Sequence, residues 1–139
     1  MIVLDASVAA SWLLAERPLP IGLEFFSSNR DMAITVPSHW PLEISNTLRT
    51  QLRAGRISIA DFHAVMDRFD LLMINVQPSM ELDEIGPLAQ FAVTHELTTY
   101  DAAYVQLALQ QQASLATLDR AMRRVAAMLN IPLLPAVTS

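Results

Sequence analysis

The sequence predicts an α/β fold in which helices cover both faces of a mainly parallel sheet, as a three-layer α/β/α sandwich. Short apolar runs typical of strands alternate with longer segments of helical character. The length of 139 residues suits one domain with a substantial core, so we expect a single domain over residues 1–139. Hydrophobic residues make up 53% of the chain and charged residues 17%, which excludes disorder and favours a largely buried sheet.

The expected strands are short, apolar and rich in branched side chains, and several are bounded by turn residues. The candidates are residues 2–4, 33–36, 73–76 and 114–117. Pro37 closes the second candidate, because the residue before a proline is held extended and proline cannot continue the ladder. The tail 131–135 adds a candidate edge strand, where proline is tolerated.

Helices are expected to connect these strands. Their predicted ranges are 6–15, 21–28, 38–55, 58–72, 79–95, a helix that begins near 101, and 119–129. Ser38 is the expected cap of the third helix and Gly55 its expected stop. Ser58 and Asp61 have the spacing of a capping box. The helix over 79–95 contains a candidate break at Gly86-Pro87.

Four acidic residues stand just after predicted strands or in the first turns of the helices that follow. They are Asp5, Glu43, Asp101 and Asp119. In an open α/β sheet, ligands bind at the carboxyl ends of the strands. Taken singly, each acid has a structural explanation, since three of them are suited to cap helices and Glu43 to occupy an exposed first turn.

Taken together, the four acids predict a site for a hard cation. Bringing two like charges to ~4 Å costs about 4 kcal/mol at an effective dielectric constant of about 20, so clustering them does not stabilise a chain. A divalent ion removes the conflict, because Mg²⁺ and Mn²⁺ prefer carboxylate and water oxygens. Such an ion lowers the pKa of a bound water and stabilises charge during displacement at phosphorus.

Three polar residues are candidates for a supporting role beside the acids. The expected core stripe of the helix over 38–55 is Ile44, Leu48 and Leu52. Asn46 lies one helical turn after Glu43, on a different, polar face of this helix. There it could orient the carboxylate or contact a phosphate, and an exposed helix amide is an equal alternative. Ser7 and Thr117 could hold a carboxylate or a metal-bound water, or only satisfy nearby backbone groups.

Other features of the sequence exclude several classes of site. The chain has no cysteine, which excludes disulfides and thiolate metal sites. The net charge of −5 argues against a general nucleic-acid-coating protein, although not against a nuclease. His39, His63 and His95 lack metal-ligand spacing, and there is no glycine-rich phosphate loop. Without a basic leader or a membrane-length apolar run, we expect a soluble, cytoplasmic protein.

Four stretches of the sequence resemble the four motifs of PIN-domain ribonucleases, in particular VapC-type toxins of bacterial toxin–antitoxin pairs. They are Met1-Ile2-Val3-Leu4-Asp5-Ala6-Ser7, Pro41-Leu42-Glu43-Ile44-Ser45-Asn46-Thr47-Leu48, Tyr100-Asp101-Ala102-Ala103-Tyr104 and Ala116-Thr117-Leu118-Asp119. Any one motif is weak evidence. Together they occur in the family's order and span the chain.

The resemblance implies an endoribonuclease that depends on Mg²⁺ or Mn²⁺ and forms a homodimer. It implies that Asp5, Glu43, Asp101 and Asp119 bind the metal and that Asn46 shapes the catalytic site. Ser7 and Thr117 match the family's supporting hydroxyl positions. The implied partners are the RNA substrate and a cognate antitoxin whose carboxy-terminal segment wraps the toxin.

The sequence departs from some relatives shortly after the last motif acid. Where those carry a further acid, this chain has Arg120, Arg123 and Arg124. The number of metal ions therefore stays open between one and two. These Arg side chains could meet RNA phosphates or form a solvated helix face, and Arg49, Arg53 and Arg56 form a second such cluster.

Other functions remain open at the level of sequence. One is a PIN-fold nuclease in RNA maturation or decay without an antitoxin. Another is a non-catalytic module that uses its groove to hold a partner, which the high hydrophobic fraction favours. If the acids served only as helix caps, they would lie far apart in the structure.

Overall fold

The computed structural model describes residues 1–13 and 31–135, and it confirms the expected α/β fold. Its sheet is entirely parallel and has five strands in the order β3-β2-β1-β4-β5. The strands are β1 (Ile2–Leu4), β2 (Ile34–Val36), β3 (Ile74–Val76), β4 (Ser114–Ala116) and β5 (Leu133–Leu134). Each expected strand is therefore present, and β5 lies at an edge beside β4.

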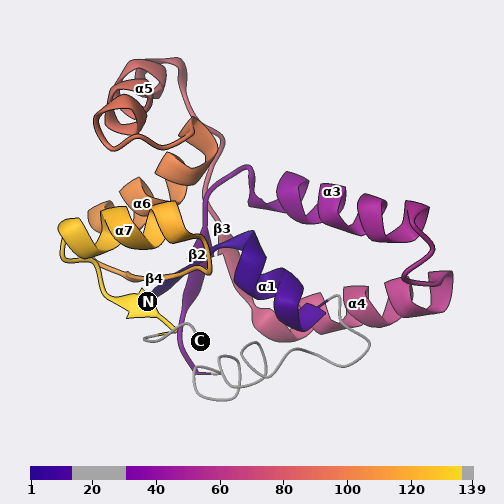
Figure 1. The fold of residues 1–139 in the computed structure, drawn as a ribbon. Coiled ribbons are helices and arrows are strands. Elements are labelled where there is room, and N and C mark those ends of the chain that lie inside the picture. The colour runs from indigo at the N-terminus through magenta and orange to yellow at the C-terminus, as the bar shows by residue number, and fades with distance from the viewer. Residues whose placement is uncertain (14–30, 136–139) are drawn as a thin grey trace.

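Helices lie on both sides of this sheet (Figure 1), as the sandwich prediction requires. One side carries α1 (Ala6–Leu13), α3 (Trp40–Arg53) and α4 (Ile59–Leu72). The other side carries α5 (Ile85–Thr94), α6 (Thr99–Gln111) and α7 (Arg120–Met128), with the short 3₁₀ helix η1 (Leu82–Glu84) before α5. The helix expected over 21–28 and the end of the first predicted helix lie outside the described residues.

Two of the predicted helix starts are confirmed by their hydrogen bonds. In α4, the Asp61 N–H donates to Ser58 Oγ and the Ser58 N–H donates to Asp61 Oδ2, which completes the predicted capping box. Asp119 caps α7, since its Oδ1 accepts the N–H of Met122 at 2.9 Å. Gly55 follows the end of α3 at φ +69°, a conformation that glycine adopts without strain.

Other helix starts differ from the prediction. The N-cap of α3 is His39 rather than Ser38, and Pro41 occupies its first turn. The segment expected to be helical from residue 79 becomes so only at Leu82, because Glu84 accepts the N–H of Glu81 and fixes the start there. Gly86-Pro87 does not break α5, since it lies in the first turn, where a missing N–H costs little.

The central strand β1 is fully buried, with Ile2, Val3 and Leu4 each 0% exposed. A strand covered by helices on both faces is expected to be continuously apolar in this way. The largest fully buried side chain is Tyr104 of α6, and Trp40 and Ile44 of α3 are buried in the same cluster. The core therefore joins the two helical layers to the strand that ends at Asp5.

The strand order creates a switch point between β1 and β4. From β1 the chain proceeds to β2 and then β3 on one side, and it returns to add β4 and β5 on the other. Crevices at the carboxyl ends of strands flanking such a reversal are the usual ligand sites of open parallel sheets. Here those ends lead into Asp5 after β1 and Thr117 after β4.

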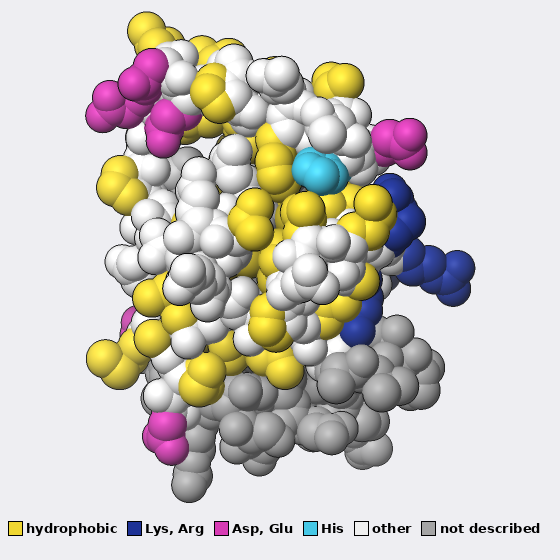
Figure 2. All heavy atoms as spheres, turned by 90° about the vertical axis from the view of Figure 1, so that its left-hand side faces the viewer, with side chains coloured by type: hydrophobic (Ala, Val, Ile, Leu, Met, Phe, Trp, Pro, Cys, Tyr) yellow, Lys and Arg dark blue, Asp and Glu magenta, His cyan; other side chains and the backbone are white. Residues whose placement is uncertain are grey.

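The surface around η1 and α5 exposes several large hydrophobic side chains. Leu82 is 86% exposed, Val93 80% and Ile85 50%. Figure 2 shows the helical face of α5 to α7, with hydrophobic side chains spread across it and acidic side chains gathered at one corner. No helix within residues 1–13 and 31–135 is both long and apolar enough to cross a membrane.

Candidate active site

Asp5 is the acid held most firmly by the fold. It directly follows β1 and is 6% exposed. The hydroxyls of Ser7 and Thr117 both donate to its Oδ2, each at 2.7 Å. Burial raises the pKa of the Asp5 carboxyl, and these two hydrogen bonds oppose that effect. The hydroxyls therefore fix one carboxylate oxygen and leave Oδ1 to other ligands.

The same two hydroxyls tie the end of β1 to the end of β4. Thr117 Oγ1 accepts the N–H of Asp119 at 3.0 Å, and Ser7 Oγ accepts the N–H of Leu118 at 3.2 Å. Thr117 is 0% exposed, so its hydroxyl is satisfied by Asp5 and Asp119 rather than by water. The sequence left two alternatives open for Ser7 and Thr117, and the structure shows both, because each hydroxyl holds the Asp5 carboxylate and also accepts a backbone N–H.

Asp101 and Asp119 lie at the starts of two helices, α6 and α7. Asp119 is the N-cap of α7, and its Oδ1 accepts the backbone N–H of Met122. Asp101 sits in the first turn of α6, and the cap there is Thr98, whose hydroxyl accepts the Asp101 N–H. A sequence-based capping role for Asp101 is therefore wrong.

Charge effects on two of the carboxyls, Asp5 and Asp101, involve all four acids. Burial raises the pKa of the Asp101 carboxyl, and the negative charges of Asp119, Asp5 and Glu43 raise it further. The charge of Glu43 also raises the pKa of Asp5. Acids that served only as separate helix caps would not act on each other in this way.

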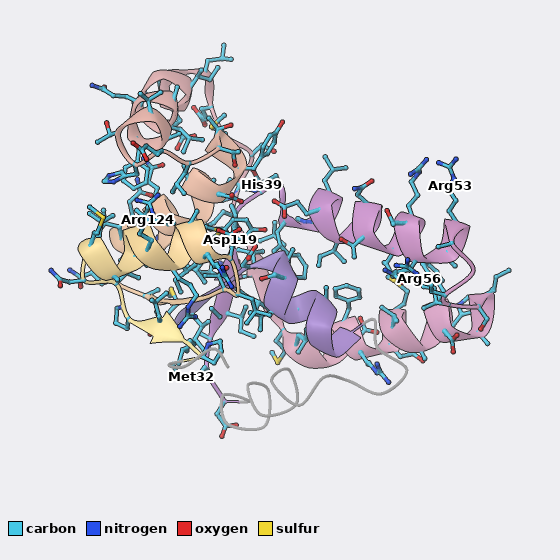
Figure 3. All side chains as sticks on the ribbon, viewed as in Figure 1. Met32, His39, Arg53, Arg56, Asp119 and Arg124 are labelled. Carbon is cyan, nitrogen blue, oxygen red and sulfur yellow. The ribbon has the colours of Figure 1, made fainter. Side chains whose placement is uncertain are left out.

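Glu43 joins this neighbourhood from the first turn of α3. Its Oε1 lies 2.8 Å from Nε2 of His39, one turn earlier, which is an ion-pair distance when the imidazole is protonated. Neither atom makes a hydrogen bond of good geometry with another described residue. Figure 3 shows His39 and Asp119 in the same central region, where α3 and α7 begin.

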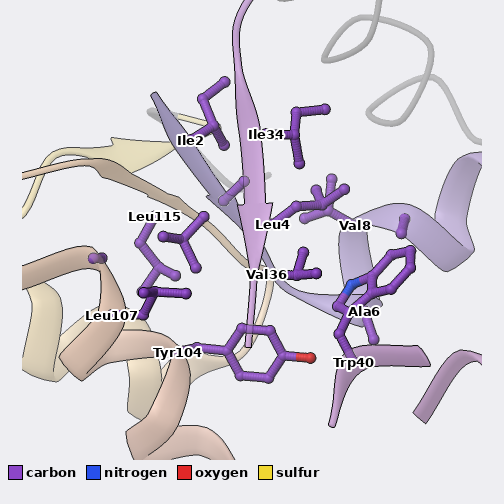
Figure 4. Packing of buried hydrophobic residues seen from close by; sticks show 14 of the residues in the cluster. Ile2, Leu4, Ala6, Val8, Ile34, Val36, Trp40, Tyr104, Leu107 and Leu115 are labelled. Atoms are coloured by element: carbon purple, nitrogen blue, oxygen red, sulfur yellow. The ribbon is translucent and has the colours of Figure 1, made fainter. Parts of the chain in front are cut away.

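Tyr104 brings a buried hydroxyl to the same region. Its side chain is 0% exposed, and its hydroxyl lies near the Ala6 backbone and the Glu43 side chain but makes no hydrogen bond of good geometry with a described residue. Figure 4 shows the hydroxyl directed toward Ala6 and Trp40. Burial, followed by the charges of Glu43 and Asp5, raises the pKa of this hydroxyl well above its ordinary value. A neutral hydroxyl therefore faces the acids.

The four carboxylates are suitable ligands for a hard divalent cation, although they do not lie close enough together to surround one. No three His, Asp or Glu side chains of the described residues lie close enough together to ligate a common ion. The charge of Glu43 raises the pKa of Asp5, and the charges of Asp119, Asp5 and Glu43 raise the pKa of Asp101, as expected for carboxylates gathered to bind a cation. Carboxylate oxygens with room for water are the ligands that Mg²⁺ and Mn²⁺ prefer.

The remaining predicted residues are placed as follows. Asn46 is exposed on α3, one turn after Glu43. Arg53 and Arg56 lie at the far end of α3 from the acids (Figure 3). Arg123 donates to the carbonyls of Thr117 and Pro135 at 2.9 and 2.8 Å. It therefore links the end of β4 to the residue that follows β5.

Sequence reasoning missed two side chains of this region. His39 is half-buried, and its contact with Glu43 was not predicted. Its spacing of four residues from an acid in a first helical turn was the available signal. Tyr104 stands three residues after Asp101, on the same side of α6. That spacing predicts a shared face, but not that the hydroxyl is buried.

Comparisons with known proteins agree with this geometry. The PIN domain family matches residues 2–128. No curated protein sequence matches with significant similarity. Among solved structures, PAE2754 from Pyrobaculum aerophilum aligns with a TM-score of 0.64 at 23% identity, over 87% of this chain and 76% of that one. FitAcB from Neisseria gonorrhoeae aligns with a TM-score of 0.62 at 15% identity, over 98% of each chain.

At these identities the two structures establish the fold alone, whereas the family match extends over most of the sequence. The four acids stand at the carboxyl edge of the parallel sheet that the match covers. On this evidence, the chain belongs to the PIN domain family, whose members are typically Mg²⁺-dependent nucleases.

Proposed function

We propose that this PIN domain is a Mg²⁺- or Mn²⁺-dependent endoribonuclease and the toxin of a toxin–antitoxin pair. The observation that supports the nuclease proposal is that Asp5, Glu43, Asp101 and Asp119 all follow strands or begin helices at the carboxyl edge of the sheet, and that the charges of the other three raise the pKa of Asp101. These four carboxylates are the proposed metal ligands. Their mutual repulsion costs stability in the free protein, which is the cost expected of a site organised for a cation.

In this proposal some residues of the site orient the carboxylates, and the carboxylates bind the cation. Ser7 and Thr117 fix Asp5 through Oδ2, so that Oδ1 is presented in one orientation. Asp119 is fixed at Oδ1 by Met122 and presents Oδ2. When bound, the divalent cation supplies a water of lowered pKa and stabilises negative charge at phosphorus. Asn46 stands one turn from Glu43, exposed and in reach of a substrate phosphate.

The toxin role rests on the resemblance of the four motifs to VapC-type toxins. In this proposal a cognate antitoxin covers the acidic site, where a basic side chain of the antitoxin would pair with the clustered carboxylates. The protein is also proposed to form a homodimer. The exposed side chains Leu82, Ile85 and Val93 support this, because apolar surface of that kind marks interfaces.

Cleavage of total bacterial RNA by the purified, antitoxin-free protein tests the nuclease proposal. Discrete fragments are expected with Mg²⁺ or Mn²⁺, and none with EDTA or with Asp5→Asn. Asp67→Asn is the matched control, because it removes the same charge from an exposed position on α4. Fragments that persist with both Asp5→Asn and Asp101→Asn would refute the assignment.

Expression in bacteria tests the toxin role separately. Growth arrest by the wild-type chain, absent with Asp5→Asn and relieved by a small protein encoded beside it, is the expected result. An active ribonuclease that does not slow growth would instead favour a PIN-fold enzyme of RNA maturation or decay without an antitoxin.

A further inference from the structure

A pocket of about 640 Å³ adjoins the acids on the α6 side of the sheet. It lies between α6, the residues that follow β2 and the residues that follow β3. Its polar lining includes Ser38, Gln77, Ser79, Gln106 and Gln110. The proposed metal ligands are not among its lining residues, so it is a separate compartment of the same surface.

Two aromatic rings connect this pocket to the acidic site. His39 and Tyr100 both line the pocket, and their rings meet edge to face with centroids 5.8 Å apart. His39 contacts Glu43, and Tyr100 immediately precedes Asp101. The pocket therefore lies beside the acidic site, and neighbouring groups of one substrate could occupy both.

The lining of the pocket suits a flat, neutral ligand with hydrogen-bonding edges. Gln106 and Gln110 stand one turn apart on α6, so their amides share one face of the helix. Gln77 faces them from the segment after β3, and its Nε2 is already bonded to Thr35 Oγ1 at 2.9 Å, which orients its carbonyl. Each amide offers both a donor and an acceptor, as a nucleobase edge requires.

The charges around the pocket argue against a phosphate as its ligand. None of its lining residues is Arg, and Glu81, Asp83 and Glu84 contribute three carboxylates. An anion would be repelled, whereas a neutral base would not. Tyr100 is 66% exposed, so its ring is available for a base to stack on.

We propose that this pocket binds an unpaired nucleobase of the RNA, next to the phosphate that lies over the acids. The inference rests on the proposed ribonuclease activity and extends it. Single-stranded or looped RNA is the substrate class that can supply such a base, because its bases can be turned out of a stack. Tyr100 stacks on the base, and Gln106 and Gln110 contact its edge.

Equilibrium binding in EDTA, where the cation needed for cleavage is absent, tests the pocket without the reaction. The probes are fluorescein-labelled oligo(A), oligo(U) and oligo(C) of about ten nucleotides, a length that spans more than one base-binding position. Gln106→Ala and Tyr100→Ala should each weaken binding of the preferred probe about ten-fold, within the range found for loss of one base contact. Gln111→Ala is the matched control, because Gln111 is exposed on the same helix and does not line the pocket.

A second measurement tests whether the pocket gives the enzyme a base preference at the cut site. The ends of the cleaved RNA are sequenced, and the wild-type chain should show a base preference at one position beside the cut. Gln106→Ala should weaken that preference, and an abasic nucleotide at that position should lower the affinity of the wild-type chain more than that of Gln106→Ala. The Gln111→Ala cut sites should match those of the wild-type chain.

The outcomes separate failure of the pocket from failure of the ribonuclease proposal. If the wild-type chain cleaves RNA and the pocket variants behave like Gln111→Ala, the pocket proposal is overturned and the nuclease stands. If the wild-type chain binds the probes through Gln106 and Tyr100 but never cleaves with metal, the base site stands and the nuclease fails. Variants that alter only the oligomeric state would show that a second copy of the chain occupies the pocket, and would also overturn the proposal.

Discussion

At the scale of single residues, Asp5 shows how a fold can hold a carboxylate in an unfavourable place. Two hydroxyl groups bind one of its oxygens, yet burial still raises the pKa of the carboxyl. The folded protein therefore binds the Asp5 proton more tightly than the unfolded chain does. For this group, the free energy of unfolding is highest at low pH and falls as pH rises above the ordinary value of 3.8 and through the raised folded pKa.

This sign leads to a prediction for Asp5→Asn in EDTA. The variant cannot ionise at this position, so at about pH 7 its free energy of unfolding should exceed that of the wild-type chain. The difference should shrink as the pH is lowered toward about 4. Urea unfolding at several pH values measures it. A variant that is less stable at neutral pH, with a gap that widens as pH rises, would contradict the raised pKa.

Tyr104 gives a second prediction at this scale. Leaving a buried hydroxyl without a partner costs about 1–3 kcal/mol, and the Tyr104 hydroxyl makes no hydrogen bond of good geometry with a described residue. Tyr104→Phe should therefore raise the free energy of unfolding in EDTA by about 1 kcal/mol. Tyr100→Phe, at an exposed ring, should leave it unchanged. A clear loss of stability in Tyr104→Phe alone would mean that the hydroxyl is satisfied after all.

At the scale of elements, helix starts decide where the acids lie. Thr98 caps α6 and so places Asp101 in the first turn, whereas Asp119 is itself the cap of α7. Both helices therefore begin at the edge of the sheet where β1 ends. In the same way, the capping box of α4 fixes where this helix begins after α3.

The α4 capping box can be tested by substitution. Ser58→Ala removes the acceptor of the Asp61 N–H and should lower the free energy of unfolding by about 1 kcal/mol, as is usual for loss of a serine cap. Ser45→Ala is the control, since Ser45 is exposed within α3 and alanine favours helices. Urea unfolding of both variants would refute the prediction if they lost equal stability.

The elements also show which parts of the structure sequence patterns predict. Capping boxes and apolar runs depend on neighbouring residues, which is why β1, α4 and the edge strand β5 could be predicted. The helical start predicted at Ser79 was wrong, because the Glu84 side chain fixes the first helical turn at η1, which begins at Leu82. Leu52 was expected in the buried stripe of α3 but is 37% exposed, since packing at a helix end depends on distant elements.

At the scale of the whole molecule, the strand order brings together motifs from the two ends of the chain. Asp5 and Thr117 are far apart in the sequence, yet they meet because β1 and β4 are adjacent parallel strands. The type and position of the four acids could be predicted from sequence. The buried Tyr104 hydroxyl and the amide-lined pocket could not, because they depend on how α6 packs against distant elements.

The central claim is that these four carboxylates form one divalent-cation site, and a Mn²⁺ binding titration tests it most directly. Isothermal titration of the wild-type chain should show saturable binding that is lost in Asp5→Asn and in Asp101→Asn and kept in Asp67→Asn, an equal change of charge at an exposed position on α4. Absence of saturable Mn²⁺ binding, or equal binding by all four proteins, would contradict the claim.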